Sequence, residues 1–424
     1  MRFYITLALL AGPLLAQQQT LNLTLAEAER LAIRNNPQFS AARFNAAASH
    51  QVPLQFRAGR LPAVSGAVTA VAADSGSRLA AGALNNPVVY DRIASGLIVN
   101  QLVADFGRTG NLIASAKLRA QAQDQVTETA RAAILIATAR AYFGVLRALA
   151  VLTVAQQTVS ARQLVSDQVT ALANSNLKSA LDVSFANVNL ADAQLLLLQA
   201  QNAVKAAEAE LAAALGLPSQ IAFSLRDEAS PGPLSGSVDP MVIQALQDRP
   251  ELKDLRLEQS AAERYAKAEH SLFYPTIAVA GAAGFVPAGE AAVPGRYGAI
   301  GVNLSIPVFN GGLFRSRQTE AELKARAATE NLNDLANRVT RDVRIAYLNA
   351  QTAFERVGLT DQLLQQAQLA LDLARGRYDL GLSSIVELSQ AQLNLTAAQI
   401  GSASAQYDYQ TERAILDYQV GALR

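Results

Sequence analysis

The strongest constraint on the fold is that one segment of the chain occurs twice in similar form. Residues 172–190 read LANSNLKSALDVSFANVNL, and residues 377–395 read RYDLGLSSIVELSQAQLNL, at an offset of 205. At this offset similar or identical residues are aligned along the two segments: Asn176 and Gly381, Leu177 and Leu382, Ser179 and Ser384, Asp182 and Glu387, Ala186 and Ala391, Asn189-Leu190 and Asn394-Leu395. A match of this extent predicts an internal tandem duplication.

Proline placement divides the chain into helical and irregular parts. All fourteen prolines lie outside residues 88–217 and 308–424. Because proline costs about 3 kcal/mol inside a helix, these two tracts are predicted to be long helices. Helices of roughly 40 to 65 residues would be on the order of 60–100 Å long. Residues 218–237, which include SPGPLSGS, are predicted to link a first repeat, residues 21–217, to a second repeat, residues 238–423.

Other elements of the two repeats also align. AIRNNPQF at residues 32–39 resembles ALQDRPEL at residues 245–252, and the same offset of 213 places Pro62 over Pro275. Further along, the offset falls to between 203 and 205. The second repeat is therefore expected to have a loop shorter by about ten residues between Pro275 and Phe309.

Four strands are predicted, two in each repeat. Residues 298–308 alternate with the two-residue period of a strand, and Leu97 and Val99 repeat the pattern more weakly. Residues 62–73 and 275–285 are the expected partner strands, each preceded or opened by proline. The alternating residues of the last strand are Ile300, Val302, Leu304 and Ile306 against Ala299, Gly301, Asn303 and Ser305. The pattern is also compatible with small soluble β-hairpins on a helical protein.

The helical tracts carry heptad seams in which large and small residues alternate. Alanine at every other position of a seam lets two backbones approach closely, so antiparallel coiled-coil pairs are predicted. The seam positions are Val183, Ala186, Leu190, Ala193, Leu197, Ala200, Val204, Ala207, Leu211 and Ala214; Leu388, Ala391, Leu395, Ala398, Ser402, Ala405 and Tyr409; and Val343, Ala346, Ala350, Ala353, Val357, Thr360, Leu364, Ala367, Leu371, Ala374 and Tyr378.

The duplicated segment is predicted to be the turn of each helical pair. Asn176 and Gly381 occupy equivalent positions, and these residue types enter the left-handed region most easily. Ser179 and Ser384 follow as candidate N-caps, with Asp182 and Glu387 at the capping-box spacing. Acidic residues in a first helical turn also interact favourably with the helix dipole. The alternative interpretation of Asp182 and Glu387 is therefore a purely structural role.

Composition excludes several classes of function. Thirty-six basic and thirty-five acidic residues give a net charge of +1 without charge blocks, so a nucleic-acid partner is not expected. Cysteine is absent, which excludes disulfides and thiolate metal sites. His50 and His270 have no neighbouring ligand pattern, and no phosphate-binding glycine loop follows a strand. The sequence therefore predicts neither an enzyme nor a bound metal or cofactor.

The first residues are typical of an export signal. MRFYITLALLAGPLLA, residues 1–16, places one arginine before an apolar run and ends on alanine. A short buried N-terminal helix is the alternative interpretation. Downstream, no run of 18 or more apolar residues is present, so no membrane-spanning helix is expected. The chain is then periplasmic, secreted or inserted into a membrane by its strands.

Several of these motifs, in order and in both repeats, resemble those of the TolC-type outer-membrane efflux proteins. They are NNPQF and DRPEL, the proline before the first strand of each repeat, PVFNGG after a strand, and YDLGLSSIVEL at the second turn. The resemblance covers residues 21–423. It implies a mainly α-helical chain with transmembrane β-strands, in which three chains form a twelve-stranded β-barrel in the outer membrane and an α-helical barrel across the periplasm. Independently of the resemblance, four strands cannot close a barrel, so an oligomer is required.

The resemblance also implies partners and sites. A homotrimer in outer-membrane lipid would be a passive duct, opened by a periplasmic adaptor and joined to an inner-membrane pump. The adaptor would contact the tips at Asn176, Leu177, Gly381, Leu382 and Ser383, and the pore aperture would be lined by Asp182, Tyr378 and Glu387.

Three positions depart from the family pattern, and one of them is Asn176, which replaces the glycine expected in the first turn. Ser383 replaces a basic residue and Gln390 a second acid, so neither an ion-paired latch nor a double acidic ring is expected. No cysteine follows the signal, so no lipid anchor is expected. A soluble periplasmic coiled-coil scaffold is the alternative function, and the exported cargo is not predicted.

Overall fold

The computed structural model describes residues 21–74, 76–77, 89–217, 223–234, 236–289 and 291–423. The predicted signal segment and most of the loop after the first strand lie outside the described residues. The chain forms two compact units, each built from both halves of the sequence. We call Met1–Phe39, Arg131–Gln244 and Arg341–Arg424 the helical unit, and Ser40–Ala130 and Ala245–Thr340 the strand unit.

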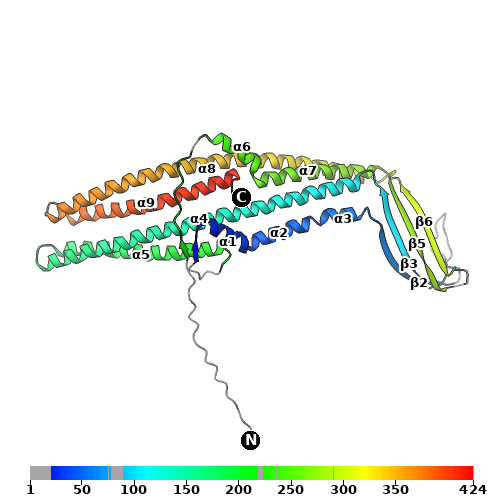
Figure 1. The fold of residues 1–424 in the computed structure, drawn as a ribbon, viewed down its shortest axis with the longest axis horizontal. Helices are drawn as coiled ribbons and strands as arrows, with labels where there is room; N and C mark the ends of the chain where they lie inside the picture. The colour runs from blue at the N-terminus through cyan, green and yellow to red at the C-terminus, as the bar shows by residue number, and fades with distance from the viewer. Residues whose placement is uncertain are drawn as a thin grey trace, which may run out of the picture. The chain divides into compact units, whose positions relative to one another are not determined.

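Two helical hairpins dominate the helical unit (Figure 1). The first joins α4 (Arg108–Asn174) to α5 (Ala180–Ala214), and the second joins α8 (Leu313–Asp379) to α9 (Ile385–Val420). Both α4 and α8 begin in the strand unit and end in the helical unit. The long helices predicted from proline placement are thereby confirmed.

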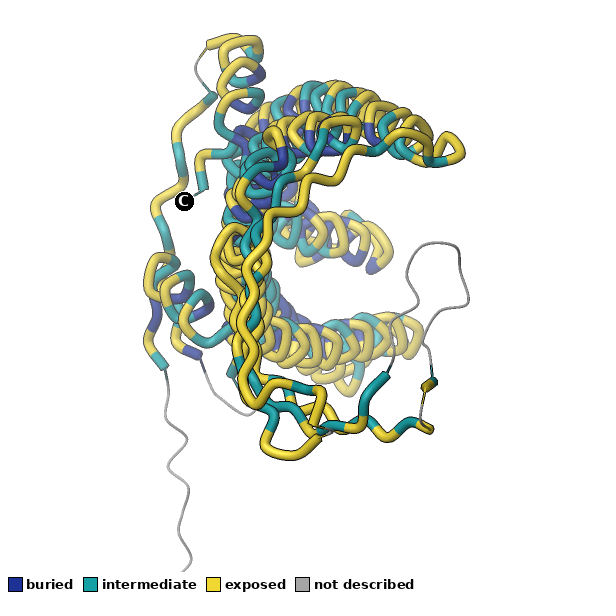
Figure 2. The backbone as a smooth tube through the Cα atoms, turned by 90° about the vertical axis from the view of Figure 1, so that its right-hand side faces the viewer, coloured by how far each residue is buried: buried dark blue, intermediate teal, exposed yellow. Residues whose placement is uncertain are grey.

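The predicted seams are the buried faces of these helices. On α5, Ala186, Ala193 and Ala200 are at most 4% exposed, whereas their neighbours on the other side of the helix are solvent-exposed (Figure 2). On α9, Ala398 and Ala405 are 2% and 1% exposed. Small residues in these positions let the paired helices pack closely.

The core of the helical unit forms around the middle of α4. Tyr142 is fully buried, and its hydroxyl donates to the carbonyls of Leu23 and Arg226 at 3.0 and 2.6 Å. These carbonyls belong to, or directly follow, two short strands, β1 (Leu21–Leu23) and β4 (Phe223–Leu225), which pair in parallel. Part of the predicted linker is therefore a strand held on the core.

Helix α4 contains one unusually apolar stretch. An 18-residue window of this helix has a mean hydropathy of 1.6, which is long and apolar enough to cross a membrane by composition. Half of that window is buried inside the chain. Because Ile134, Tyr142 and Val145 from this region are core residues, the stretch is apolar for packing.

Short helices connect these parts. In the helical unit they are α1 (Leu25–Asn35), which opens with a capping box of Thr24 and Glu27, and α6 (Val238–Asp248). The segments leading to the strands are α2 (Pro37–Ser49), α3 (Val52–Ala58), α7 (Pro250–His270) and the 3-10 turn η1 (Ser271–Phe273). Pro37 and Pro250 each begin a helix, where the missing N–H does no harm.

The strand unit contains the four predicted strands in one antiparallel sheet. They are β2 (Ala63–Val71), β3 (Arg92–Ala104), β5 (Thr276–Gly289) and β6 (Arg296–Ser305), in the order β2-β3-β5-β6. The β2-β3 hairpin of the first half and the β5-β6 hairpin of the second half form one sheet because β3 pairs with β5. Within the described residues, neither β2 nor β6 has a further partner strand, so both edges of the sheet are open.

Candidate functional site

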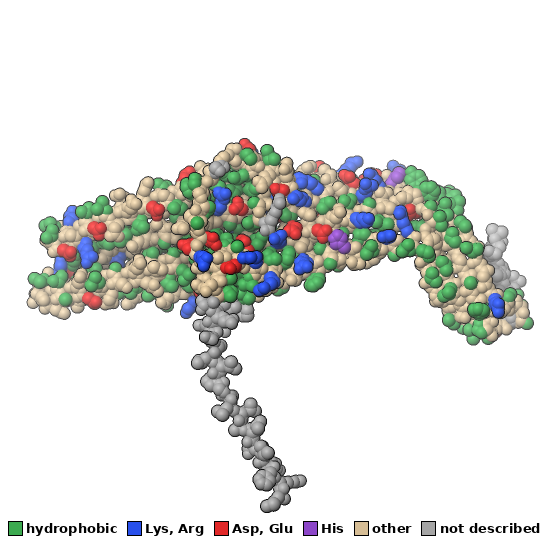
Figure 3. Space-filling view, in the orientation of Figure 1, with side chains coloured by type: hydrophobic (Ala, Val, Ile, Leu, Met, Phe, Trp, Pro, Cys, Tyr) green, Lys and Arg blue, Asp and Glu red, His purple; other side chains and the backbone are tan. Residues whose placement is uncertain are grey.

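One face of the sheet carries large apolar side chains, several of which are solvent-exposed in the described part of the chain. The register places Val64 beside Val99, Val279 beside Val302, and Ile277 beside Leu304 on this face. Ile300 and Val302 are 83% and 72% exposed. Figure 3 shows apolar side chains interspersed with backbone and other side chains on the visible surface of the strands. An exposed apolar surface of this kind marks a contact with lipid or protein.

The opposite face carries mostly small residues, with Ile98 and Leu102 of β3 as larger exceptions. Ala63, Ser65, Ala67 and Thr69 alternate with the large residues of β2, and Ala299, Gly301 and Asn303 do so on β6. Gly96 and Gly284 are paired on β3 and β5, and a Cβ at either position would overlap Tyr297. Glycine is therefore required where this aromatic side chain lies across the two strands. A large apolar face opposite a small or polar face is typical of membrane β-strands.

Aromatic residues lie at the end of the sheet where the strands meet the helices. Phe106 follows β3, Tyr274 precedes β5, and Phe309 follows β6, with 55%, 46% and 90% of each residue exposed. The Phe106 and Tyr274 rings are 6.2 Å apart, and the Phe273 and Phe314 rings are 5.9 Å apart. Exposed aromatic residues at strand ends are typical of membrane-water interfaces.

The two turns of the helical unit have the same backbone geometry. Asn176 and Gly381 both adopt the left-handed conformation, with φ of 58° and 73°. In the first turn the Leu177 N–H donates back to the Leu172 carbonyl at 2.9 Å. In the second turn the Leu382 N–H donates back to the Arg377 carbonyl at 2.8 Å. The predicted equivalence of Asn176 and Gly381 is confirmed, because both end a helix with the same left-handed cap.

The helix caps after the two turns differ. Asp182 closes a reciprocal capping box, in which its carboxylate accepts from the Ser179 N–H at 3.0 Å and the Ser179 hydroxyl at 2.7 Å. Hydrogen bonds from Ser179 lower the pKa of Asp182 below its ordinary value. Ser384 caps α9, yet the carboxylate of Glu387 lies 3.4 Å from the Arg377 guanidinium. The predicted capping box is therefore formed by Asp182, whereas Glu387 does not complete one and lies near Arg377 instead.

An apolar cluster lies beneath both turns. It contains Val169 of α4, Ala186 of α5, and Tyr378, Ile385 and Leu388 of the second hairpin. Tyr378 is 5% exposed, and the Lys178 ammonium lies 3.7 Å from the centre of its ring. The cluster and this cation-π contact link the turn of one hairpin to the other.

The residues predicted to form the tip are otherwise exposed. Leu177 and Leu382 are 69% and 68% exposed at the two turns. Asn176 and Gly381 are also exposed, whereas Ser383 is half-buried and its hydroxyl has no hydrogen-bond partner in the described structure. The structure thus brings the predicted tip residues together at two neighbouring turns, with Tyr378 below them.

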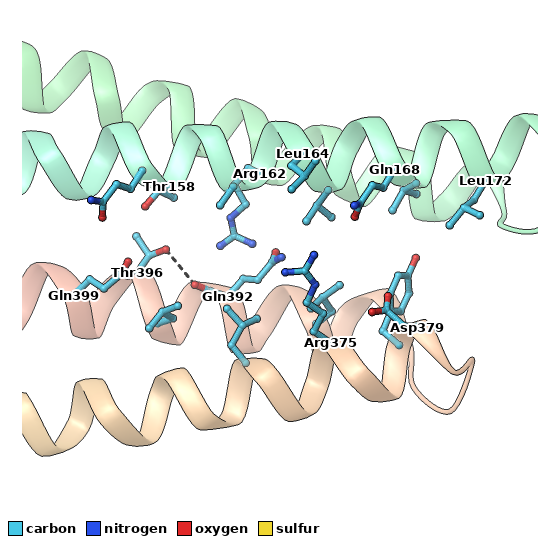
Figure 4. A pocket seen from close by; sticks show the side chains of 18 residues that line it. Thr158, Arg162, Leu164, Gln168, Leu172, Arg375, Asp379, Gln392, Thr396 and Gln399 are labelled. Carbon is cyan, nitrogen blue, oxygen red and sulfur yellow. Dashed lines mark hydrogen bonds between the residues drawn. The ribbon is translucent and has the colours of Figure 1, made fainter.

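A cavity between the two hairpins was not predicted. It has a volume of about 250 Å³ and is lined by α4, α8 and α9 (Figure 4). Two arginines, Arg162 and Arg375, point into it. Arg162 lies on the buried stripe of α4, four residues after Thr158 and seven before Val169. A charged residue at these apolar spacings is a signal in the sequence that could have identified it.

Comparison with known proteins gives a consistent family. The family model described as outer membrane efflux protein matches residues 29–217 and 241–422. The outer membrane protein TolC of Salmonella enteritidis is 26% identical over 352 residues, which are 78% of this chain and 71% of TolC. The alkaline protease secretion protein AprF of Pseudomonas aeruginosa is 25% identical over 429 residues, covering 97% and 87% of the two chains.

A solved structure supports the same fold. The outer membrane protein VceC of Vibrio cholerae superposes with a TM-score of 0.81 at 21% identity, covering 94% of this chain and 96% of VceC. The long helices and the sheet described above are therefore the fold of known outer-membrane channels.

Proposed function

Because this chain belongs to the outer membrane efflux protein family, we propose that it is a passive exit duct of a tripartite efflux or type I secretion system. The family consists of transport channels, and its members lie in the outer membrane with their helical part in the periplasm. The names of two relatives fit this proposal, since AprF is a secretion protein and TolC an outer membrane protein. A soluble scaffold, the alternative function, is not favoured by these relatives.

The observation that carries the proposal is the open sheet with its uncovered apolar face. Unpaired strand edges are not tolerated in lipid, so the edges of β2 and β6 must meet other strands. Three copies would supply twelve strands, enough to close a barrel with the large apolar face outward and the small face toward the lumen. The tandem duplication would explain why each half contributes one hairpin.

The lengths of the strands and their aromatic ends fit a membrane span. The four strands contain 9 to 14 residues, and a tilted strand needs about 9–11 to cross a bilayer. Phe106, Tyr274 and Phe309 would then lie at one interface, and Phe285 on the large apolar face would lie toward the other. Their rings would lie at the level of the lipid headgroups.

We assign adaptor contact to the two turns. Leu177 and Leu382 expose apolar side chains at equivalent positions, with the Asn176, Gly381 and Ser383 backbone beside them. Each chain would therefore present two similar apolar tips, which suit the apolar contacts of another protein's helical hairpin. Adaptor binding would open the duct by favouring one arrangement of the helices.

We assign the pore aperture to Asp182, Glu387 and Tyr378. Three copies of Glu387 around the axis would hold cations and disfavour anions. Asp182 would add charge that is partly fixed by the N-cap of α5. Tyr378 is buried below the turns and would contribute to the aperture by holding Lys178, whose ammonium lies over its ring. Arg377 would reduce the field of Glu387 while the two remain paired.

Membrane fractionation tests this function. The proposed duct is expected in the outer-membrane fraction and to migrate as a trimer on a gel without heating, because a closed barrel resists detergent. Heating should convert the trimer to single chains. A chain released with the soluble periplasm as a stable monomer would contradict the proposal.

A further inference from the structure

The cavity between the hairpins contains a buried arginine with an unsatisfied hydrogen-bond donor. Arg162 is 5% exposed, and its Nη1 atom has no hydrogen-bond partner in the described part of the chain. A buried charge is costly unless it is paired and hydrogen-bonded. One donor of this guanidinium, Nη1, therefore lacks an acceptor in the described part of the chain.

The charge of Arg162 persists at neutral pH. Burial lowers the pKa of Arg162 to about 10, and the negative charge of Asp192 acts against this shift. A group with a pKa of about 10 is almost fully protonated at pH 7. The missing partner must accordingly be an anion or a strong acceptor.

The side chains around Arg162 add further hydrogen-bond donors for an anionic group. Arg375 enters the cavity from α8, on the opposite side from Arg162, and the Gln392 side chain enters from α9 (Figure 4). Asp379 is the acidic residue among those that line the cavity, and it lies toward the turn, away from Arg162 (Figure 4). Two guanidinium groups and an amide supply several donors to a carboxylate.

The remaining wall is apolar. Leucines from three helices line it, among them Leu164, Leu371 and Leu395. A volume of about 250 Å³ suits a small organic molecule more than a bare ion. We propose that this cavity binds a small organic anion, whose acidic group contacts Arg162 and Arg375 and whose apolar part lies against the leucines. The bound anion would bridge α4 of one hairpin and α8 of the other.

Calorimetric titration of the purified full-length trimer in non-ionic detergent tests the proposal. The probes are benzoate, its neutral analogue benzamide, and inorganic phosphate. Benzoate is expected to bind at least about tenfold more tightly than benzamide, because only benzoate has a negative charge that can pair with Arg162. It should also bind more tightly than phosphate, which has no apolar part. Equal binding of benzoate and benzamide, or tighter binding of phosphate, would overturn the proposed ligand class.

Variants locate the binding to the cavity. Arg162→Met keeps side-chain length without the charge and should weaken benzoate binding at least about tenfold, whereas Arg162→Lys should retain part of it. Arg375→Gln should have a smaller effect because Arg375 is exposed. Arg264→Gln on α7, an exposed arginine outside the cavity, is the matched control and should bind as the unmodified chain does. Unchanged affinity in Arg162→Met would contradict the site.

Two further outcomes are decisive. If Arg162→Met does not assemble, melting of the unmodified trimer replaces it: benzoate should raise the melting temperature and benzamide should not. If the assembled trimer does not bind benzoate at all, the proposal fails. An acidic side chain of another copy or of a partner protein would then supply the counter-charge of Arg162.

Discussion

The guanidinium of Arg377 lies 3.4 Å from the carboxylate of Glu387, across the turn that joins α8 to α9. Both side chains are about half exposed, so the pair is a weak one that solvent screens. Under the proposed function this pair stands at the aperture and makes opposite contributions to its electric field. Its two members can therefore be separated by experiment.

Reversal potentials in planar bilayers measure these contributions. Glu387→Gln should remove most of the preference for cations, because the ring of carboxylates is lost. Arg377→Gln should increase that preference, because it leaves Glu387 unpaired. An unaltered reversal potential in both variants would remove Glu387 and Arg377 from the aperture.

Ser179 is predicted to stabilise the first turn through the capping box. Ser179→Ala should cost about 1 kcal/mol, since it removes the cap from the N-terminus of α5. Ser184→Ala is the control, because the Ser184 hydroxyl only bonds back to the Ala180 carbonyl within the same helix. Denaturant unfolding compares the two. A loss of equal size in both variants would mean that the cap contributes little.

Asp182 gives this turn a defined dependence on pH. Its pKa is lowered in the folded chain by hydrogen bonds from Ser179, so its stabilising effect is present above the unfolded value near 3.8. The effect is lost as pH falls further, through the folded pKa. The melting difference between the unmodified chain and Asp182→Asn should be constant from neutral pH to about pH 5 and shrink in stronger acid. A difference that grows in acid would contradict this assignment.

The helix seam of α5 is predicted to be intolerant of larger residues. Ala193→Leu or Ala200→Leu should destabilise the chain by about 1–3 kcal/mol, because both alanines are 4% exposed at the helix contact. Ala191→Leu, on the exposed side of the same helix, is the matched control. Thermal unfolding or trimer dissociation measures the effect, and unchanged behaviour of the seam variants would place the contact elsewhere.

The two faces of β6 should respond differently to a charge. Val302→Arg places a charge on the large apolar face and should cost about 2–4 kcal/mol if that face lies in lipid near the bilayer centre. Asn303→Arg changes the small face and should be tolerated much better. The yield of unheated trimer in the outer membrane measures both. Equal yields would show that the large face does not meet lipid.

The elements set by local chemistry could be predicted from the sequence. Alternation around Val302 predicted a strand, the alanine spacing of α5 predicted its buried face, and the position of Asn176 and Gly381 predicted left-handed turns. Each of these depends on residues within one or two turns or strands. Local patterns therefore gave most of the elements and their faces.

What was missed depends on distant contacts. The pairing of β1 with β4 joins three-residue segments about 200 positions apart, too short to show a period. The burial of Arg162 depends on how one hairpin faces the other, and the partner of Glu387 depends on the rotamer of Arg377. The tip residues were identified by resemblance, and their roles in adaptor contact and at the aperture stay proposals.

Disulfide trapping across the open edges tests the central claim, that copies of this chain complete one another's sheet. The chain has no cysteine, so an Asn303→Cys substitution on β6 can be combined in turn with cysteine at Ala63, Ser65, Ala67 or Thr69 on β2. At the matching register, oxidation should give covalent dimers and trimers in the outer membrane and no larger species, because three copies close the ring. Monomers at every position, or a ladder that continues beyond the trimer, would contradict the closed assembly.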